Sequence, residues 1–181
     1  MDDASSTTFT QLLTTIPTDN PQTILELGTR KWGTASTHHK HLFPNAEHYI
    51  MADFIDGDDV HIVSDAHDLK EFPDRTFDHV FSASTFEHIQ YPWVAAKAIW
   101  RVLKPAGTVF VQTHQTFPIH GYPNDYTRWS DQGLRSLFEY AGFEVISADM
   151  FDKCVIQPRA DYAVWDTNAP AYIGVAVLAR K

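Results

Sequence analysis

Glycine and acidic residues close three successive apolar segments of this chain. The first segment, residues 23–27, ends at Gly28, the second ends at Asp53, and the third ends at Asp65. A glycine at a strand end lets the backbone turn and leaves no side chain between the chain and a ligand. Because ligands of open α/β sheets bind at the carboxyl ends of the strands, the pattern predicts a nucleotide-type binding corner.

Histidines are the other candidates for chemistry, since the chain has ten of them. His38 and His41 would lie one turn apart on a helix, with His39 beside them. Neither a His-Glu-x-x-His pattern nor a cysteine pair accompanies them, and the single cysteine excludes a multi-cysteine zinc site. We therefore interpret these three histidines as an exposed polar face and expect no metal.

Two further histidines are candidates for proton transfer. His88 follows the apolar segment 77–83, where a neutral imidazole can take a proton from a hydroxyl or an amine. His120 and Tyr126 lie in segment 114–129, which is long for a connection without regular structure and is therefore expected to be functional. We predict catalytic roles for all three side chains, and a structural role for His88 stays open.

The same long segment offers contacts for a second substrate. Four of its polar and aromatic residues are predicted to bind it: His114, Tyr122, Arg128 and Trp129. Two alternatives remain open. The aromatic residues can form a satellite hydrophobic cluster, and Arg128 can pair with Asp125 to hold the loop.

The elements that position these residues follow from hydrophobic periodicity and turn signals. Apolar runs predict strands at residues 23–28, 48–53, 60–65, 77–83, 108–113, 143–148 and 173–179. Helical spacing predicts helices at residues 9–16, 33–43, 93–103 and 131–141. This alternation predicts an α/β fold with a Rossmann-like seven-stranded, mostly parallel sheet, helices on both faces and an antiparallel last strand.

Size and charge exclude several classes of protein. With 181 residues, the chain is expected to form a single domain over residues 1–181, in which residues 1–20 are a polar N-terminal segment and helix. The net charge of −9 argues against binding to nucleic acid and to anionic membranes. No signal peptide or membrane span is evident, so a cytoplasmic location is expected.

Four segments of the chain carry a resemblance to a known family. They are Ile24-Leu25-Glu26-Leu27-Gly28, then Asp53, then Phe77 to Ala83 with Phe86-Glu87-His88, and Arg101 to Gly107. In these segments the chain resembles the small class I S-adenosylmethionine-dependent methyltransferases of the type 11 group. Residues 120–129 are similar to a subset associated with glycan and secondary-metabolite pathways. One departure is that Thr29 to Trp32 replace the middle glycine of the usual three.

The resemblance implies a cofactor and a set of residues that hold it. It implies that Glu26 meets the amino group of S-adenosyl-L-methionine, Asp53 the ribose, and Asp65 with Ala66 the adenine. The full cofactor-binding set is Glu26, Gly28, Thr29, Gly33, Asp53, Phe54, Asp65, Ala66, Ser82 and Ala83. The function implied is methyl transfer to an oxygen or nitrogen of a small-molecule acceptor, a sugar or a secondary metabolite.

Several alternatives stay open beside this reading. Glu26 can order the loop after its strand, and Asp53 and Asp65 can cap turns. A non-catalytic module that binds the cofactor or a protein partner would keep the same acids. A nicotinamide-dependent oxidoreductase is disfavoured because Gly28-Thr29-Arg30 lacks the second glycine of Gly-x-Gly-x-x-Gly. Without an inserted cap domain, the acceptor must be covered by the N-terminal segment, by residues 114–129 or 152–170, or by a second subunit in a homodimer.

Overall fold

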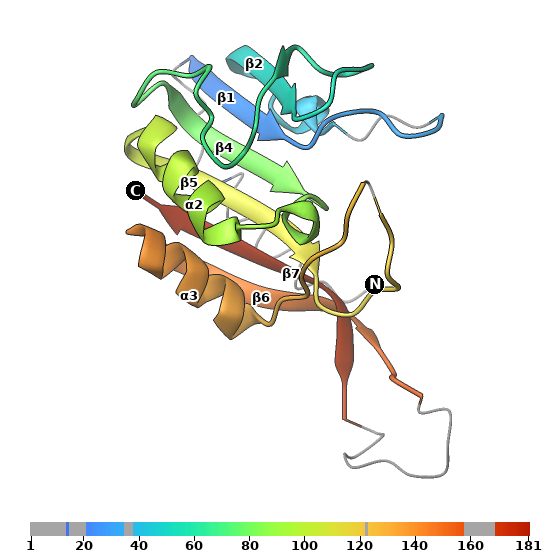
Figure 1. Ribbon diagram of the computed structural model, residues 1–181. Coiled ribbons are helices and arrows are strands. Elements are labelled where there is room, and N and C mark those ends of the chain that lie inside the picture. Colours follow the sequence, from blue (N-terminus) through green and yellow to red (C-terminus); the bar gives the residue numbers. More distant parts are fainter. Residues whose placement is uncertain (1–13, 15–20, 35–37, 122, 158–168) are drawn as a thin grey trace.

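Seven strands form one sheet in the order β3-β2-β1-β4-β5-β7-β6 (Figure 1). The computed structural model describes residues 14, 21–34, 38–121, 123–157 and 169–181. The strands are β1 Gln22–Leu27, β2 Ala46–Asp53, β3 Ile62–Val63, β4 Phe77–Ala83, β5 Leu103–His114, β6 Glu144–Cys154 and β7 Ala171–Arg180. The pairs from β3 to β5 are parallel, and β7 is antiparallel to both β5 and β6. This confirms the predicted Rossmann-like sheet with its antiparallel last strand.

Two α-helices lie on one face of this sheet (Figure 1). They are α2, Pro92–Val102, and α3, Asp131–Ala141. Both ends of α3 are capped, because the Ser130 hydroxyl accepts a hydrogen bond from the Gly133 amide at 3.0 Å and Gly142 adopts a left-handed φ of 106°. Among the described residues, none of the helices is long and apolar enough to cross a membrane.

Each face of the sheet has its own hydrophobic cluster. The larger cluster joins the buried side of the sheet to α2 and α3, and includes Leu25, Val80, Ile99, Val109 and Phe138. The smaller cluster lies on the opposite face and includes Ile24, Phe43, Tyr49, Phe81 and Phe110. Because strands β1, β4 and β5 are buried on both faces, their carboxyl ends form a rigid edge for a site.

The helix predicted over residues 33–43 is wrong. The described residues of this range form a turn at 33–34 and a single turn of 3₁₀ helix, η1, at Lys40–Leu42. A competing set of hydrogen bonds explains the difference, because both the amide and the ring of His39 bind Glu26 on β1. The helix predicted over 9–16 lies outside the described residues except for Thr14.

Two other differences concern strand length. Residues 104–107, which lie between the predicted helix 93–103 and the predicted strand 108–113, bulge out of β5, since Leu103 pairs with Phe77 while Thr108 pairs with His79. Strands β6 and β7 are longer than predicted and continue past the sheet as a two-stranded ribbon (Figure 1). The ribbon keeps its ladder as far as Cys154 and Ala171, so backbone pairing rather than side-chain periodicity determines its length.

Candidate functional site

The glycine corner after β1 differs from its predicted form. Gly28 adopts a left-handed φ of 81°, as the turn requires, and its amide donates to the carbonyl of Ala52 at 2.9 Å. A Cβ atom at this position would lie 1.9 Å from the Thr85 hydroxyl, which bonds the carbonyls of Ala83 and Leu27. The space left by the missing side chain is therefore filled by Thr85, from the segment after β4. The glycine pattern in the sequence predicts this space to be free for a ligand.

The segment that replaces the usual glycine-rich loop is tied to its neighbour. The Thr29 hydroxyl is buried and donates to the carbonyl of Asp59 at 2.7 Å. The guanidinium of Arg30 lies 4.3 Å from the Trp32 ring centroid, and Gly33 adopts a φ of 69°. Side-chain contacts thus order a loop that glycines would otherwise leave free to move.

Glu26 is buried and orders the chain that follows β1. Its carboxylate accepts hydrogen bonds from the His39 amide at 3.0 Å and from the Tyr49 hydroxyl at 2.7 Å, and the His39 ring lies 2.8 Å away. Burial and the adjacent carboxylate raise the pKa of Tyr49 above its ordinary value, so the phenol stays a donor. These contacts support the loop-ordering alternative, and they remove His39 from the exposed face predicted with His38 and His41.

Asp53 lies at the carboxyl end of β2 and holds the next turn. Its two carboxylate oxygens accept from the amides of Arg30 and Ile55, each at 3.1 Å. A carboxylate has about four acceptor positions, so this capping role leaves lone pairs for two further hydroxyl donors. The next residue, Phe54, exposes 51% of its surface.

The remaining predicted cofactor residues occupy the adjoining strand ends. The Asp65 carboxylate accepts from the amide and ring of His67, and its carbonyl accepts from the Leu69 amide, so it caps the turn after β3. Ala66 packs against the larger hydrophobic cluster. On β4, the buried Ser82 hydroxyl bonds the carbonyl of Leu27, and Ala83 packs on the opposite face of the sheet.

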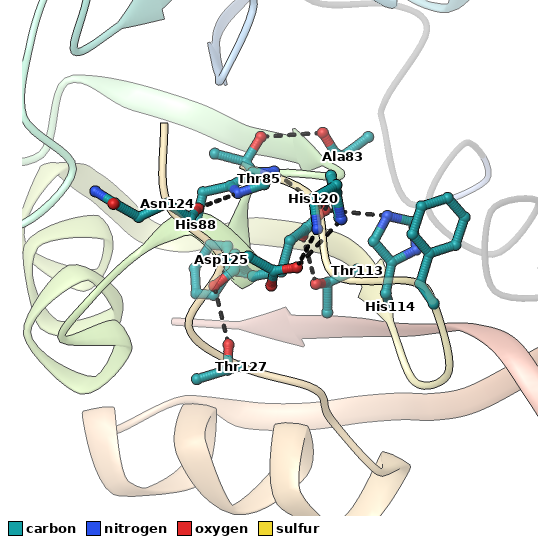
Figure 2. A network of polar contacts seen from close by, with 12 residues as sticks. Ala83, Thr85, His88, Thr113, His114, His120, Asn124, Asp125 and Thr127 are labelled. Atoms are coloured by element: carbon teal, nitrogen blue, oxygen red, sulfur yellow. Dashed lines mark hydrogen bonds and ion pairs between the residues drawn. The ribbon is translucent and has the colours of Figure 1, made fainter. Parts of the chain in front are cut away.

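A cluster of three histidines and one carboxylate lies at the carboxyl ends of β4 and β5 (Figure 2). Glu87 and His88 belong to the 3₁₀ helix η2, Phe86–His88, while His114 ends β5 and His120 comes from the loop after it. The Nε2 atoms of the three imidazoles lie 3.7, 3.1 and 3.7 Å from Oε1 of Glu87, for His88, His114 and His120 respectively. Tertiary structure thus joins residues 33 positions apart in the chain.

Glu87 is the fully buried centre of this cluster. Its Oε2 accepts a hydrogen bond from the Thr113 hydroxyl at 2.7 Å. Burial alone would raise the pKa of Glu87, but the contacts with His114 and Thr113 outweigh it and hold the pKa below its ordinary value. The carboxylate is therefore ionised inside the protein, where a negative charge requires a nearby cation or several donors.

Backbone carbonyls determine which nitrogen of two imidazoles carries the proton. Nδ1 of His88 lies 2.5 Å from the carbonyl of Asn124, and Nδ1 of His120 lies 3.1 Å from the carbonyl of Pro118. Because a carbonyl only accepts, the neutral ring holds its proton on Nδ1 and directs the Nε2 lone pair toward the cluster. The Asp125 carboxylate, 3.2 Å from Nδ1 of His120, supports this tautomer.

Arg128 and Asp125 order the loop that carries His120. The guanidinium binds both carboxylate oxygens of Asp125 and also donates to the carbonyls of Phe117, Pro118 and Thr127. This pairing lowers the pKa of Asp125 strongly. The contacts use all five N–H donors of Arg128, so the geometry supports the loop-holding alternative over contact with an acceptor.

The other predicted residues of the loop have different surroundings. The amide of Tyr126 donates to the Glu87 carbonyl at 2.7 Å, and its side chain is 44% exposed. Trp129 packs against the larger hydrophobic cluster, as the satellite-cluster alternative expects. The His114 ring stacks on Phe117 with centroids 4.3 Å apart. Tyr122 lies outside the described residues.

Glu87 and Thr113 were not among the sequence candidates. Glu87 precedes the predicted catalytic His88, and Thr113 is the penultimate residue of β5. The pairing of Ala83 with Gln112 brings the segments after the two strands together. A usable signal was present, because Glu87 is an acidic residue between a predicted strand and a candidate catalytic histidine.

Comparisons with known proteins agree with the fold. Residues 40–111 match the family described as a methyltransferase domain, and no curated protein sequence matches the chain. A SAM-dependent methyltransferase from Archaeoglobus fulgidus is similar in structure, with a TM-score of 0.63, 16% identity, and coverage of 98% of this chain and 95% of its own.

Two further solved structures share the fold. The 1,6-didemethyltoxoflavin-N1-methyltransferase from Burkholderia thailandensis, with 1,6-didemethyltoxoflavin and S-adenosylhomocysteine bound, has a TM-score of 0.66 and 12% identity over 98% of this chain and 76% of its own. A Haloferax volcanii complex of the Trm112 methyltransferase activator with a protein assigned as a methyltransferase also has this fold. The TM-score is 0.65 and the identity 21%, with coverage of 96% of this chain and 87% of its own. Residues 40–111 therefore match a methyltransferase domain, and the chain as a whole has the fold of S-adenosylmethionine-dependent methyltransferases.

Proposed function

We propose that this enzyme transfers the methyl group to an oxygen or nitrogen of a small-molecule acceptor, a sugar or a secondary metabolite. The observation that carries the proposal is the cluster of His88, His114 and His120 around the buried Glu87. Such a cluster can accept a proton from a hydroxyl or a ring nitrogen at the edge where the sheet binds its ligands.

The cofactor is proposed to lie across the carboxyl ends of β1, β2 and β4. When bound, it supplies an electrophilic methyl group on sulfur. Asp53 accepts the two ribose hydroxyls, Phe54 stacks on the adenine, and Gly28 lets the backbone approach the methionine end. The fit rests on the left-handed Gly28, on the acceptor positions that remain at Asp53, and on the exposed ring of Phe54.

On the acceptor side, His88 and His120 are proposed to take the proton that the acceptor loses. Each ring donates from Nδ1 to a carbonyl, so each Nε2 carries the basic lone pair. Asp125 and Glu87 stabilise the imidazolium that forms, as a carboxylate beside a catalytic histidine does. Much of the rate is expected from holding the acceptor in line with the methyl group.

The loop from His114 to Trp129 is proposed to cover the acceptor. Its apolar side chains Phe117 and Ile119 are exposed, Ile119 to 92%. The Burkholderia structure supports an acceptor of this class, because it holds a small heterocycle and is a nitrogen methyltransferase. The same exposed side chains favour contact with a second subunit as the alternative cover.

The test is methyl transfer from labelled S-adenosylmethionine over a panel of sugars, nucleotide sugars and aromatic or heterocyclic metabolites. We expect label in a small-molecule product with wild-type protein and far less with His120→Ala. Label only in added protein or nucleic acid would contradict the proposal. Thermal shifts with S-adenosylmethionine but no turnover on any acceptor would favour the alternative of a non-catalytic binding module.

A further inference from the structure

The cluster around Glu87 also has the composition of a metal site. One ligand atom from each of Glu87, His114 and His120 lies within 4.8 Å of the other two. Two imidazoles and a carboxylate are the ligands that first-row divalent ions such as Zn²⁺, Fe²⁺ and Co²⁺ prefer in proteins. The sequence expectation of no metal rested on His38, His39 and His41 and on short motifs, whereas these ligands come from three separate segments.

The distances suit an ion at the centre of the cluster. Ligand atoms about 2.0–2.1 Å from a tetrahedral ion lie about 3.3–3.4 Å from one another. Oε1 of Glu87 lies 3.1 Å from Nε2 of His114 and 3.7 Å from Nε2 of His120. Shifts of a few tenths of an ångström would therefore complete this part of the coordination shell. Nε2 of His88 lies 3.7 Å from the same oxygen but is not within 4.8 Å of all the other ligand atoms, so His88 lies beside the site.

The outer contacts are those expected around metal-binding histidines. A metal-bound imidazole usually donates its other N–H to a carboxylate or a carbonyl, which orients the ring. His120 has this arrangement on Nδ1 with the Asp125 carboxylate and the Pro118 carbonyl, and His88 has it with the Asn124 carbonyl. These contacts direct Nε2 of both rings toward Glu87.

The charge of Glu87 gives an independent reason for a cation. Its side chain is fully buried, and its Oε1 accepts no well-aligned hydrogen bond from the described residues. The nearest guanidinium, that of Arg128, is held by the Asp125 carboxylate. A single imidazolium would balance the charge but would repel a second, whereas one divalent ion would satisfy the carboxylate and the imidazole lone pairs together.

We propose that Glu87, His114 and His120 bind one divalent transition-metal ion. In the ion-bound state the Nε2 lone pair of His120 is a ligand, so His88 beside the site is the base of the proposed function. Three protein ligands leave a coordination position for an oxygen of the acceptor, whose hydroxyl the ion would acidify. This last role rests on the proposed function, but ion binding itself does not.

The test measures ion binding by protein that has been stripped with a chelator and dialysed. Co²⁺ is titrated with absorbance as the readout, and Zn²⁺ by calorimetry. We expect one ion per chain and visible Co²⁺ bands of low-symmetry coordination. His114→Ala and His120→Ala should each weaken binding by about tenfold or more. The matched control is His67→Ala, which removes an imidazole beside Asp65 at the same edge and should leave affinity unchanged.

The outcomes separate the proposal from its rivals. Wild-type protein that binds neither ion, or that keeps its affinity in both cluster variants, would overturn it. Equal weakening by His67→Ala would also overturn it, because the effect would then be nonspecific. Circular dichroism of the metal-free variants checks folding, and His120 lies in a surface loop where substitution leaves the core intact. Binding of S-adenosylmethionine by the same metal-free samples reports separately on the proposed function.

Discussion

At the scale of single residues, Asp53 tests the cofactor site most directly. Replacing it with Ala removes the acceptors for two ribose hydroxyls, each charge-assisted bond contributing roughly 1.5–3 kcal/mol before compensation. We expect the dissociation constant of S-adenosylmethionine, measured by calorimetry, to rise at least about tenfold. Asp58→Ala is the matched control, because its side chain is exposed in the adjoining loop. An unchanged constant for the Asp53 variant would place the ribose elsewhere.

His120 and Tyr126 test the acceptor side in the same way. His120→Ala removes a basic nitrogen of the cluster, and Tyr126→Phe removes the hydroxyl of a half-exposed ring in the same loop. Each change is expected to lower turnover or acceptor affinity while S-adenosylmethionine binds within about twofold of wild type. Wild-type turnover in both variants would show that the loop is only a scaffold, and His88 would then be the remaining candidate for the base.

Gly28 and Gly33 allow backbone strain to be separated from a steric clash of an added Cβ atom. Both are left-handed, but an added Cβ meets Thr85 at Gly28 and meets nothing within 4 Å at Gly33. Gly33→Ala should therefore cost about 1 kcal/mol of unfolding free energy from backbone strain alone. Gly28→Ala should cost clearly more in urea unfolding, and adding Thr85→Ala should recover part of the difference. Equal costs for the two glycines would contradict the tight approach of Thr85.

At the scale of elements, the loop 114–129 depends on one ion pair. The Arg128 guanidinium joins Asp125 to the carbonyls of Phe117 and Pro118, so it closes the loop on itself. Arg128→Ala should speed hydrogen–deuterium exchange of loop amides while leaving exchange in β4 and β5 slow. Arg135→Ala is the control, since Arg135 lies on α3, where it forms a 3.7 Å pair with Glu139 and donates to the Val145 carbonyl at 3.5 Å. None of its polar contacts in the described part of the chain reaches this loop. Equal protection of the loop in both variants would show that other contacts hold it.

At the scale of elements, a tertiary hydrogen bond can also override local helix propensity. The range 131–141 has a cap, an amphipathic pattern and a C-terminal glycine, and it forms the helix predicted for it. The range 33–43 lacks such end signals, and the bond from His39 to the buried Glu26 holds the chain in another conformation. Local signals therefore predicted the element that they fully specify and failed where a distant carboxylate competes for the backbone.

At the scale of the whole molecule, a buried histidine couples stability to pH. The ring of His79 on β4 bonds the Thr108 hydroxyl on β5, and burial lowers the pKa of His79 to about 4. Between that value and the unfolded pKa of about 6.5, the unfolded chain binds more protons, so stability falls as the pH falls. This group should cost about 2 kcal/mol of unfolding free energy at pH 5 relative to pH 7.5.

Urea unfolding of His79→Gln at the two pH values measures this contribution. The variant should lose most of the additional pH dependence, whereas His41→Gln, on an exposed side chain, should keep the wild-type slope. A wild-type slope in the His79 variant would mean that other groups set the acid sensitivity of the fold.

The sequence by itself determined the sheet and its binding edge. Apolar runs that end in Gly28, Asp53 and Asp65 are local features, and the strand period and the helix caps act over a few residues. Such signals were enough to predict seven strands and their mostly parallel arrangement, while the cofactor was implied by the family resemblance. They also placed His88, His114 and His120 near the acceptor side, since all three follow the carboxyl ends of neighbouring strands.

Only the tertiary structure decided what those side chains do. The burial of Glu87, the approach of three imidazoles to one of its oxygens, and the saturation of Arg128 depend on how β4 lies beside β5 and how the loop folds back. The same holds for Thr85, which fills the space over Gly28. Contacts between residues far apart in the chain are set by packing and register. Local patterns in a single sequence do not show them, so they are seen only in the folded structure.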